Sequence, residues 1–229
     1  MTHATPRSAD AARQPADPQR SQLVVFGAGG HGREVADIAV EAQRAGGPEV
    51  IGFADSDSSR KGDVMNGHPI LGGWDWLDDQ DRDRVGVAVA VGTPNNTERL
   101  CRRVRDLGFA LVSVVSPLAH ISAGAQIGPG ALVFPFVSVH VGARIGEGVT
   151  LNVGSSVSHE STVGNWSTIA PGARLAGAVT VGEAANIGMM SAVIQTLSVG
   201  DRAVVGAGAV VVRDVAAGQT VVGVPARPI

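Results

Sequence analysis

Residues 151–181 read LNVGSSVSHESTVGNWSTIAPGARLAGAVTV, and every sixth position of this stretch, beginning with Leu151, is aliphatic. The same rule extends outward in both directions, from Val115 to Val211, over seventeen aliphatic residues without a slip. A period of six fits the two-residue period of a strand, whereas a helix would scatter these side chains around its surface. The pattern predicts a β solenoid in which three six-residue units, or hexads, form a triangular coil that rises about 4.8 Å.

The other places of each hexad, counted from its aliphatic residue, support this interpretation. Turn-forming residues gather at the third and fourth places, as in Pro129-Gly130 and Pro171-Gly172, where the chain must turn a corner. The fifth place is nearly always small, as a narrow interior requires. These small residues are Ala125, Ala131, Ala143, Ser155, Ser161, Ala173, Ala185, Ala203 and Ala209.

A different pattern precedes the solenoid. Apolar runs at residues 23–26, 50–53, 85–91 and 110–114 read as strands, and helices are expected after the glycine loop GAGGHG (27–32) and over residues 97–107. This alternation predicts a small parallel sheet of Rossmann type. We therefore expect a Rossmann-like domain at 21–113, a solenoid domain at 114–229 and a disordered tail at 1–20, which has no periodicity.

Ligands of such sheets bind at the carboxyl ends of the strands. Three segments fall there: residues 27–32 with Gly29, Gly30 and His31, then residues 55–57 with Asp55 and Ser56, and finally residues 92–96 with Gly92.

The loop fits the spacing GxGxxG, and its bare amides at a helix N-terminus favour a phosphate or another anion. A tight structural turn is the alternative. Asp55 and Ser56 suit ribose hydroxyls or a base edge, or else form a solvated loop.

Composition narrows the function classes. The net charge of -3 and the lack of a basic cluster argue against nucleic acid, and no apolar run is long enough to span a membrane. Cys101 is the only cysteine, so no internal disulfide can form. These features fit a cytoplasmic protein.

His159 and Glu160 occupy the third and fourth places of one hexad, so both belong to one corner of the solenoid. A carboxylate beside an imidazole fixes its tautomer and raises its basicity, as a general base requires. Gly177 lies one coil above His159, where its amide could face an oxyanion, and Asn152 in the preceding hexad adds a polar contact. The alternative is an ordinary surface histidine beside a glutamate.

Two other functions remain open on the residues alone. A zinc hydro-lyase would need three histidines, but His120, His140 and His159 share neither a column nor a corner. A non-catalytic sugar-nucleotide sensor on a trimeric scaffold would leave the pair of His159 and Glu160 without a role.

From residue 23 onward, the sequence resembles the left-handed β-helix sugar acyltransferases of the sialic acid O-acetyltransferase type. It is most similar to bacterial nucleotide-sugar N-acetyltransferases that modify 4-amino-4,6-dideoxyhexoses. The resemblance rests on GAGGHG, on Asp55, on VAVG ending at Gly92, and on LNVGSSVSHESTVG, IAPGARLAG and the closing VGVPAR. It implies a Rossmann-like domain followed by a left-handed parallel β-helix.

The resemblance also implies roles. His159 is the general base and Glu160 raises its basicity, while Gly29, Gly30, His31, Asp55, Ser56 and Gly92 contact the nucleotide-sugar. Acetyl-CoA lies between neighbouring subunits of a homotrimer, at positions matching Thr168, Met189 and Ala207, and no metal is expected.

The implied reaction is N-acetylation of a nucleotide-linked 4-amino-4,6-dideoxy sugar for bacterial glycan synthesis. O-acetylation of sialic acid or a related sugar is the alternative. Related sequences often carry histidine where this chain has Thr168, so a contact to cofactor or substrate there is altered.

Overall fold

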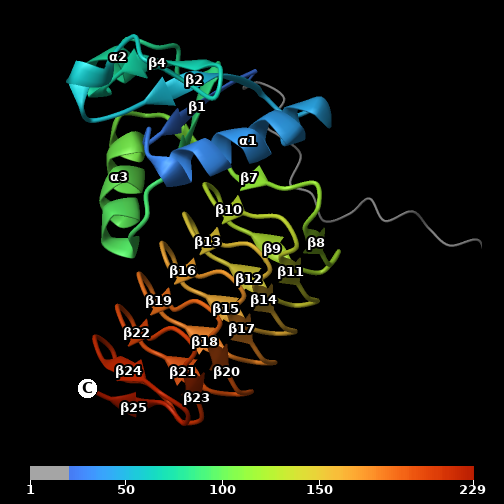
Figure 1. Cartoon of the computed structure of the whole chain (residues 1–229). Helices are drawn as coiled ribbons and strands as arrows, with labels where there is room; N and C mark the ends of the chain where they lie inside the picture. Colours follow the sequence, from blue (N-terminus) through green and yellow to red (C-terminus); the bar gives the residue numbers. More distant parts are fainter. Residues whose placement is uncertain (1–20) are drawn as a thin grey trace, which may run out of the picture.

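The computed structural model describes residues 21–229, and the predicted tail at 1–20 lies outside the described residues. A layered α/β unit forms one end of the molecule, and a tapering stack of coils runs from it to the C-terminus (Figure 1). The two parts correspond to the two sequence patterns. The fold is a Rossmann-like unit followed by a left-handed parallel β-helix, as the sequence predicts.

The sheet of the α/β unit has the order β3-β4-β2-β1-β5-β6. Its strands are β1 (Gln22–Phe26), β2 (Glu49–Ala54), β3 (Val64–Met65), β4 (His68–Gly72), β5 (Val85–Val89) and β6 (Ala110–Leu111). All neighbours pair in parallel except β3 with β4. The helices are α1 (Gly30–Arg44), η1 (Ser58–Arg60), α2 (Trp74–Asp78) and α3 (Pro94–Asp106). Because β2 and β5 lie on opposite sides of β1, the strand order reverses at β1, which is where open α/β sheets bind ligands.

Two details of this unit differ from the sequence prediction. The antiparallel pair β3–β4 was not expected, although its turn residues Asn66 and Gly67, both at positive φ, form the strongest short hairpin signal. The strand expected at 110–114 is two strands in different sheets, since β6 pairs with β5 and β7 (Val114–Val115) pairs with β10 (Leu132–Val133). The apolar run is therefore continuous across the junction between the two folds.

The solenoid follows the predicted register. From Val114 to Val211, paired strands are eighteen residues apart, as in Val133, Leu151 and Ile169. Every predicted inward aliphatic position from Val133 to Val211 is buried, whereas Val115, Ile121 and Ile127 in the first coil are partly buried.

The solenoid strands form three sheets, which we name after their position in each coil. The first sheet contains β7, β10 (Leu132–Val133), β13 (Thr150–Leu151), β16 (Thr168–Ile169), β19 (Asn186–Ile187), β22 (Val204–Val205), β24 (Thr220–Val222) and β25 (Arg227–Pro228). The second sheet contains β8 (His120–Ile121), β11 (Ser138–Val139), β14 (Ser156–Val157), β17 (Arg174–Leu175), β20 (Ala192–Val193) and β23 (Val210–Val211). The third sheet contains β9 (Gln126–Ile127), β12 (Arg144–Ile145), β15 (Thr162–Val163), β18 (Thr180–Val181) and β21 (Ser198–Val199).

From Gly130 to Gly208, each corner has a left-handed residue at the fourth place of the hexad, whereas Leu118 and Gly124 in the first coil do not. Glycine supplies it at six corners, for example at Gly148 and Gly172, where positive φ carries no steric cost. Elsewhere a bulkier residue adopts the same conformation. These non-glycine residues are Phe136, Glu160, Trp166, Ala178, Ala184, Met190, Thr196 and Arg202.

Two helices of the α/β unit pack against the solenoid. Helix α1 packs over β7 in the first coil, and the His31 ring stacks on Phe134 with 5.5 Å between ring centroids. Helix α3 runs beside the edge of the coils (Figure 1). None of the described helices has the length and apolarity needed to cross a membrane.

Candidate active site

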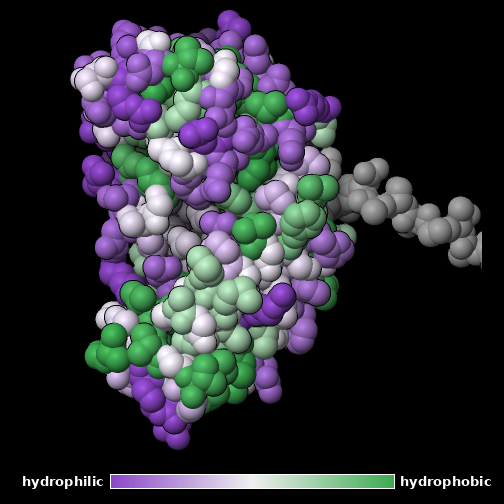
Figure 2. All heavy atoms as spheres, in the orientation of Figure 1, coloured by the Kyte–Doolittle hydropathy of each residue, from purple (hydrophilic) through white to green (hydrophobic). Residues whose placement is uncertain are grey.

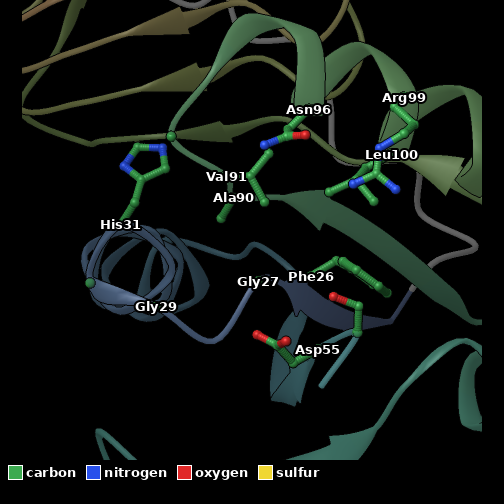
Figure 3. A pocket seen from close by; sticks show the side chains of 13 residues that line it. Phe26, Gly27, Gly29, His31, Asp55, Ala90, Val91, Asn96, Arg99 and Leu100 are labelled. Carbon is green, nitrogen blue, oxygen red and sulfur yellow. The ribbon is translucent and has the colours of Figure 1, made fainter. Parts of the chain in front are cut away.

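A cavity of about 400 Å³ opens at the carboxyl ends of β1, β2 and β5. Side chains from α1, α3 and the strand ends point toward this common space (Figure 3). The lining residues are Phe26, Gly27, Gly29, Gly30, His31, Asp55, Ser56, Ala90, Val91, Gly92, Asn96, Arg99 and Leu100. Six of the seven residues predicted to contact substrate lie together here, and Asn152 is the exception.

The glycine loop brings backbone close to the cavity. A Cβ on Gly27 (φ +118°) would overlap the Ala90 carbonyl, and a Cβ on Gly32 would overlap the Gly27 carbonyl, so both positions require glycine. Gly29 and Gly30, by contrast, have open space beside them. Gly29 precedes α1 without a side-chain cap, so the first amides of a fifteen-residue helix remain available to an anion.

Asp55 fixes the shape of this loop. Its carboxylate accepts hydrogen bonds from the amide of Ala28 at 2.7 Å and from the amide of Asp57 at 2.9 Å. Arg60 donates to the Ala28 carbonyl at 2.6 Å and lies 3.9 Å from the Asp55 carboxylate. Asp55 therefore supports the cavity wall as well as facing the cavity.

His31 forms the boundary between the cavity and the solenoid. Burial lowers the pKa of His31 below its ordinary value of 6.5, and the nearby Glu34 carboxylate, 3.7 Å from Nδ1, opposes this shift only in part. The imidazole is therefore neutral at neutral pH and offers one donor and one acceptor.

Helix α3 supplies two polar groups to the cavity: Asn96, which belongs to the predicted segment 92–96, and Arg99, which the sequence analysis missed. Asn96, Arg99 and Leu100 line the cavity from positions separated by three and four residues, which fall on one face of a helix. Arg99 forms no ion pair or side-chain hydrogen bond within residues 21–229. The helix begins at Pro94 rather than at residue 97, because proline suits the first helical position, and this places Asn96 inside it.

The second predicted site lies at the corner between the second and third solenoid sheets. His159 Nδ1 is 3.6 Å from a Glu160 carboxylate oxygen, and the two side chains are 61% and 74% exposed. Gly177 lies directly against the imidazole, where any Cβ would overlap the ring. Its amide has no hydrogen-bond acceptor among the described residues, so the N–H is free beside His159.

The remaining predicted residues lie on the first sheet or at the corner that follows it. Asn152 is outside the cavity, and its side-chain oxygen accepts from the amide of Val153 at 2.7 Å. Thr168 begins β16 on the outward face of the first solenoid sheet, while Met189 and Ala207 occupy one corner in successive coils. The second sheet separates this corner from His159.

Other groups give no sign of alternative chemistry. Cys101 is fully buried, and burial raises the pKa of its thiol to about 12, which leaves no accessible thiolate. Within residues 21–229, no three His, Cys, Asp or Glu side chains are grouped as metal ligands would be. His120 and His140 approach to 6.4 Å between ring centroids, and His140 Nε2 lies 3.1 Å from Ser138 Oγ.

Known proteins share this architecture. Residues 22–104 match the PglD N-terminal domain family. No curated protein sequence matches the chain.

The similar solved structures extend the likeness to nearly the whole chain. The acetyltransferase domain of PglB from Neisseria gonorrhoeae, in complex with acetyl coenzyme A, is 32% identical over 92% of this chain and 100% of that one, with a TM-score of 0.85.

A second match is a histidine-to-alanine mutant of GDP-perosamine N-acetyl transferase from Caulobacter crescentus, in complex with CoA and GDP-perosamine. It is 32% identical over 91% of this chain and 96% of that one, with a TM-score of 0.84. WeeI from Acinetobacter baumannii is 31% identical over 90% of this chain and 99% of that one, with a TM-score of 0.82. With its PglD-type N-terminal domain and unbroken hexads, the chain belongs to the hexapeptide-repeat sugar N-acetyltransferases.

Proposed function

We propose that the protein transfers the acetyl group of acetyl-CoA to the amino group of a nucleotide-linked 4-amino-4,6-dideoxy sugar. The observation that carries the proposal is similarity, over 91% and 92% of this chain, to a GDP-perosamine N-acetyl transferase and to a domain in complex with acetyl coenzyme A. The cavity beside the glycine loop offers the chemistry that a nucleotide diphosphate requires. Bacterial glycan synthesis is the context we infer, with the reaction in the cytoplasm.

In this proposal the nucleotide occupies the cavity of the α/β unit. The first amides of α1 and the Arg99 guanidinium, which has no ion pair within residues 21–229, suit the diphosphate, because both favour negative charge. Asp55 and Ser56 lie at the opposite wall, where they suit ribose hydroxyls or a base edge. The neutral ring of His31 directs the sugar end toward the solenoid.

His159 is the proposed general base. The acceptor nitrogen attacks the thioester carbonyl carbon, His159 takes a proton from that nitrogen, and the C–S bond breaks to release the CoA thiolate, which receives the proton. Glu160, whose carboxylate lies 3.6 Å from Nδ1, orients the imidazole, and the amide of Gly177, which has no acceptor among the described residues, donates to the developing oxyanion. No acyl-enzyme is needed, in keeping with the buried Cys101.

We further propose a homotrimer with active sites between neighbouring copies. Within one chain the nucleotide cavity, the His159 corner and the positions Thr168, Met189 and Ala207 lie apart. One edge of the solenoid also exposes large apolar side chains, which a partner copy would cover. These residues are Leu118, Phe136, Val153, Met189 and Met190. Figure 2 shows hydrophobic surface gathered over the lower coils, toward the C-terminus.

The test is an acceptor panel assayed with acetyl-CoA. UDP-, GDP- and dTDP-linked 4-amino-4,6-dideoxy sugars are compared with their 4-hydroxy counterparts and with free sialic acid, and thiol release is followed. We expect turnover only with an amino sugar, and a product resistant to mild alkali, because amides survive where acetyl esters hydrolyse. An alkali-labile product would assign the protein to O-acetylation instead.

A further inference from the structure

One face of helix α3 lines the cavity, and another contacts the solenoid. Asn96, Arg99 and Leu100 face the nucleotide cavity. Asn95, Glu98, Arg102 and Arg105 recur at the spacing of the other face, and each contacts the solenoid or another member of this set. The position of the cavity residues is therefore linked to the contacts on the opposite side of the same helix.

The solenoid offers α3 a continuous surface at the corner where the third sheet returns to the first. We name Glu147, Gly148, Trp166 and Arg202 the docking corner. Trp166 is buried, it donates to Glu147 at 3.3 Å, and the Arg102 guanidinium lies 4.6 Å from its ring centroid. Gly148 leaves the space that α3 occupies, since a Cβ there would meet Trp166 at 2.9 Å and Cys101 Sγ at 3.1 Å.

Trp166 adopts the left-handed conformation, with φ +58°. A bulky side chain in that region costs free energy and persists where its surroundings favour it. Six other corners make the same turn with glycine, and the rest use a non-glycine residue as Trp166 does. What assigns Trp166 to docking the helix is the burial of its large ring beside Arg102 of α3.

Arg202 completes the contact at the N-terminal end of α3. Its guanidinium donates to Asn95 and to Glu98, both at 2.7 Å, and Glu98 also accepts from Arg102 at 3.1 Å. The Glu98 side chain is only 17% exposed. The hydrogen bond from Arg202 holds the pKa of Glu98 below its ordinary value, with a smaller contribution from Arg102, so the pair is charged at neutral pH.

We propose that Arg202 and Trp166 are positioning residues for nucleotide-sugar binding: they hold α3 so that Asn96 and Arg99 face the cavity. The inference rests on the proposed function, since it takes the cavity to be the nucleotide site. Arg202 lies on the solenoid and lines no part of the cavity, so its effect passes entirely through α3. Replacing Arg202 should therefore change the affinity for nucleotide without changing KM for acetyl-CoA.

The experiment compares wild type, Arg202→Ala, Arg202→Lys and the control Arg44→Ala, which removes an exposed charge at the distant end of α1. GDP and UDP are titrated calorimetrically, and steady-state kinetics give KM for each substrate. For Arg202→Ala we expect dissociation constants for nucleotide and KM for nucleotide-sugar to rise about fivefold, with kcat and KM for acetyl-CoA unchanged. Arg202→Lys should recover part of the loss, because ammonium cannot reproduce the two-pronged contact.

Each outcome decides something. Equal nucleotide affinity of Arg202→Ala and wild type, with or without a lower melting temperature, overturns the positioning role. A wild type that binds neither nucleotide overturns the proposed cavity function, and the inference with it. Faster hydrogen exchange in α3 of Arg202→Ala, at unchanged exchange in β10 to β22, supports the inference independently of ligand. Trp166→Phe, which keeps an apolar ring, should lie between wild type and Arg202→Ala in affinity.

Discussion

The two proposed sites are built in opposite ways. The His159 corner is made of residues adjacent in sequence or one coil apart, and the repeat itself brings His159, Glu160 and Gly177 together. The nucleotide cavity is made of segments distant in sequence, held by cross-links such as Ala28 to Asp55 and Arg60 to Ala28. The corner therefore tolerates changes elsewhere in the chain, whereas the cavity depends on contacts beyond its own lining.

Removing the base tests whether the two sites are separable. His159→Ala should lower kcat by about 10²–10⁴-fold, because one general base contributes that much. GDP or UDP affinity should equal that of wild type. The matched control is His140→Ala, an exposed histidine one coil back, which should retain full turnover. Retained turnover in His159→Ala would remove this residue from the role of base.

Gly177→Ala tests the corner without removing any functional group. The new methyl would occupy the space of the His159 ring, which must then rotate or shift. We expect kcat to fall about 10²-fold, the effect of a displacement near 1 Å, with little change in melting temperature. In the His159→Ala background the same change should cost little more, since the two residues act as one unit. Additive losses would show that Gly177 acts independently of the ring.

Asp55→Ala tests the cavity wall. It leaves the amides of Ala28 and Asp57 without their acceptor, and we expect unfolding to require about 1–3 kcal/mol less, together with weaker nucleotide binding. Urea unfolding and calorimetric titration measure the two effects. Asp57→Ala, which alters an exposed carboxylate bonded to Ser59, is the control. Equal unfolding free energies for the two variants would contradict the proposed support of the loop.

The smallest expected effect is on the pH dependence of folding stability. Because burial lowers the pKa of His31, the unfolded chain binds more protons than the folded one below the ordinary value of 6.5. The stability that the neutral ring contributes is present above that value and is lost as pH falls through the folded pKa. Melting temperatures between about pH 8 and about pH 5 should therefore decline less in His31→Gln than in wild type. Identical declines would show that this ring does not titrate as the structure indicates.

The sequence predicts the His159 corner because strand alternation and the eighteen-residue repeat together determine where each residue lies in its coil. His159 and Gly177 meet as that register requires. The strand-end positions Gly29, Asp55 and Gly92 also meet, because parallel strands deliver their carboxyl ends to one edge of a sheet.

The missed residues depend on tertiary contacts. Arg60 reaches Ala28 from a short turn of helix, and nothing in its own segment indicates that partner. Arg99 was missed although it lies within the predicted helix, because the apolar pattern of that helix does not indicate which of its polar residues meet the cavity. Arg202 contacts Glu98, more than one hundred positions away in sequence, and no periodicity in either segment predicts the pair.

At the docking corner, the rise of helix α3 can be compared with the rise of the solenoid coils. Helix α3 rises about 10.5 Å between Asn95 and Arg102, seven residues at 1.5 Å each. The solenoid rises about 9.6 Å between the coils of Arg202 and Trp166, two coils at 4.8 Å each. The two repeats coincide over this interval, so Arg202 and Trp166 both find their partners on one straight helix. A coil inserted between them would leave the solenoid regular yet carry one contact out of reach, so coil number and helix length in this enzyme must change together.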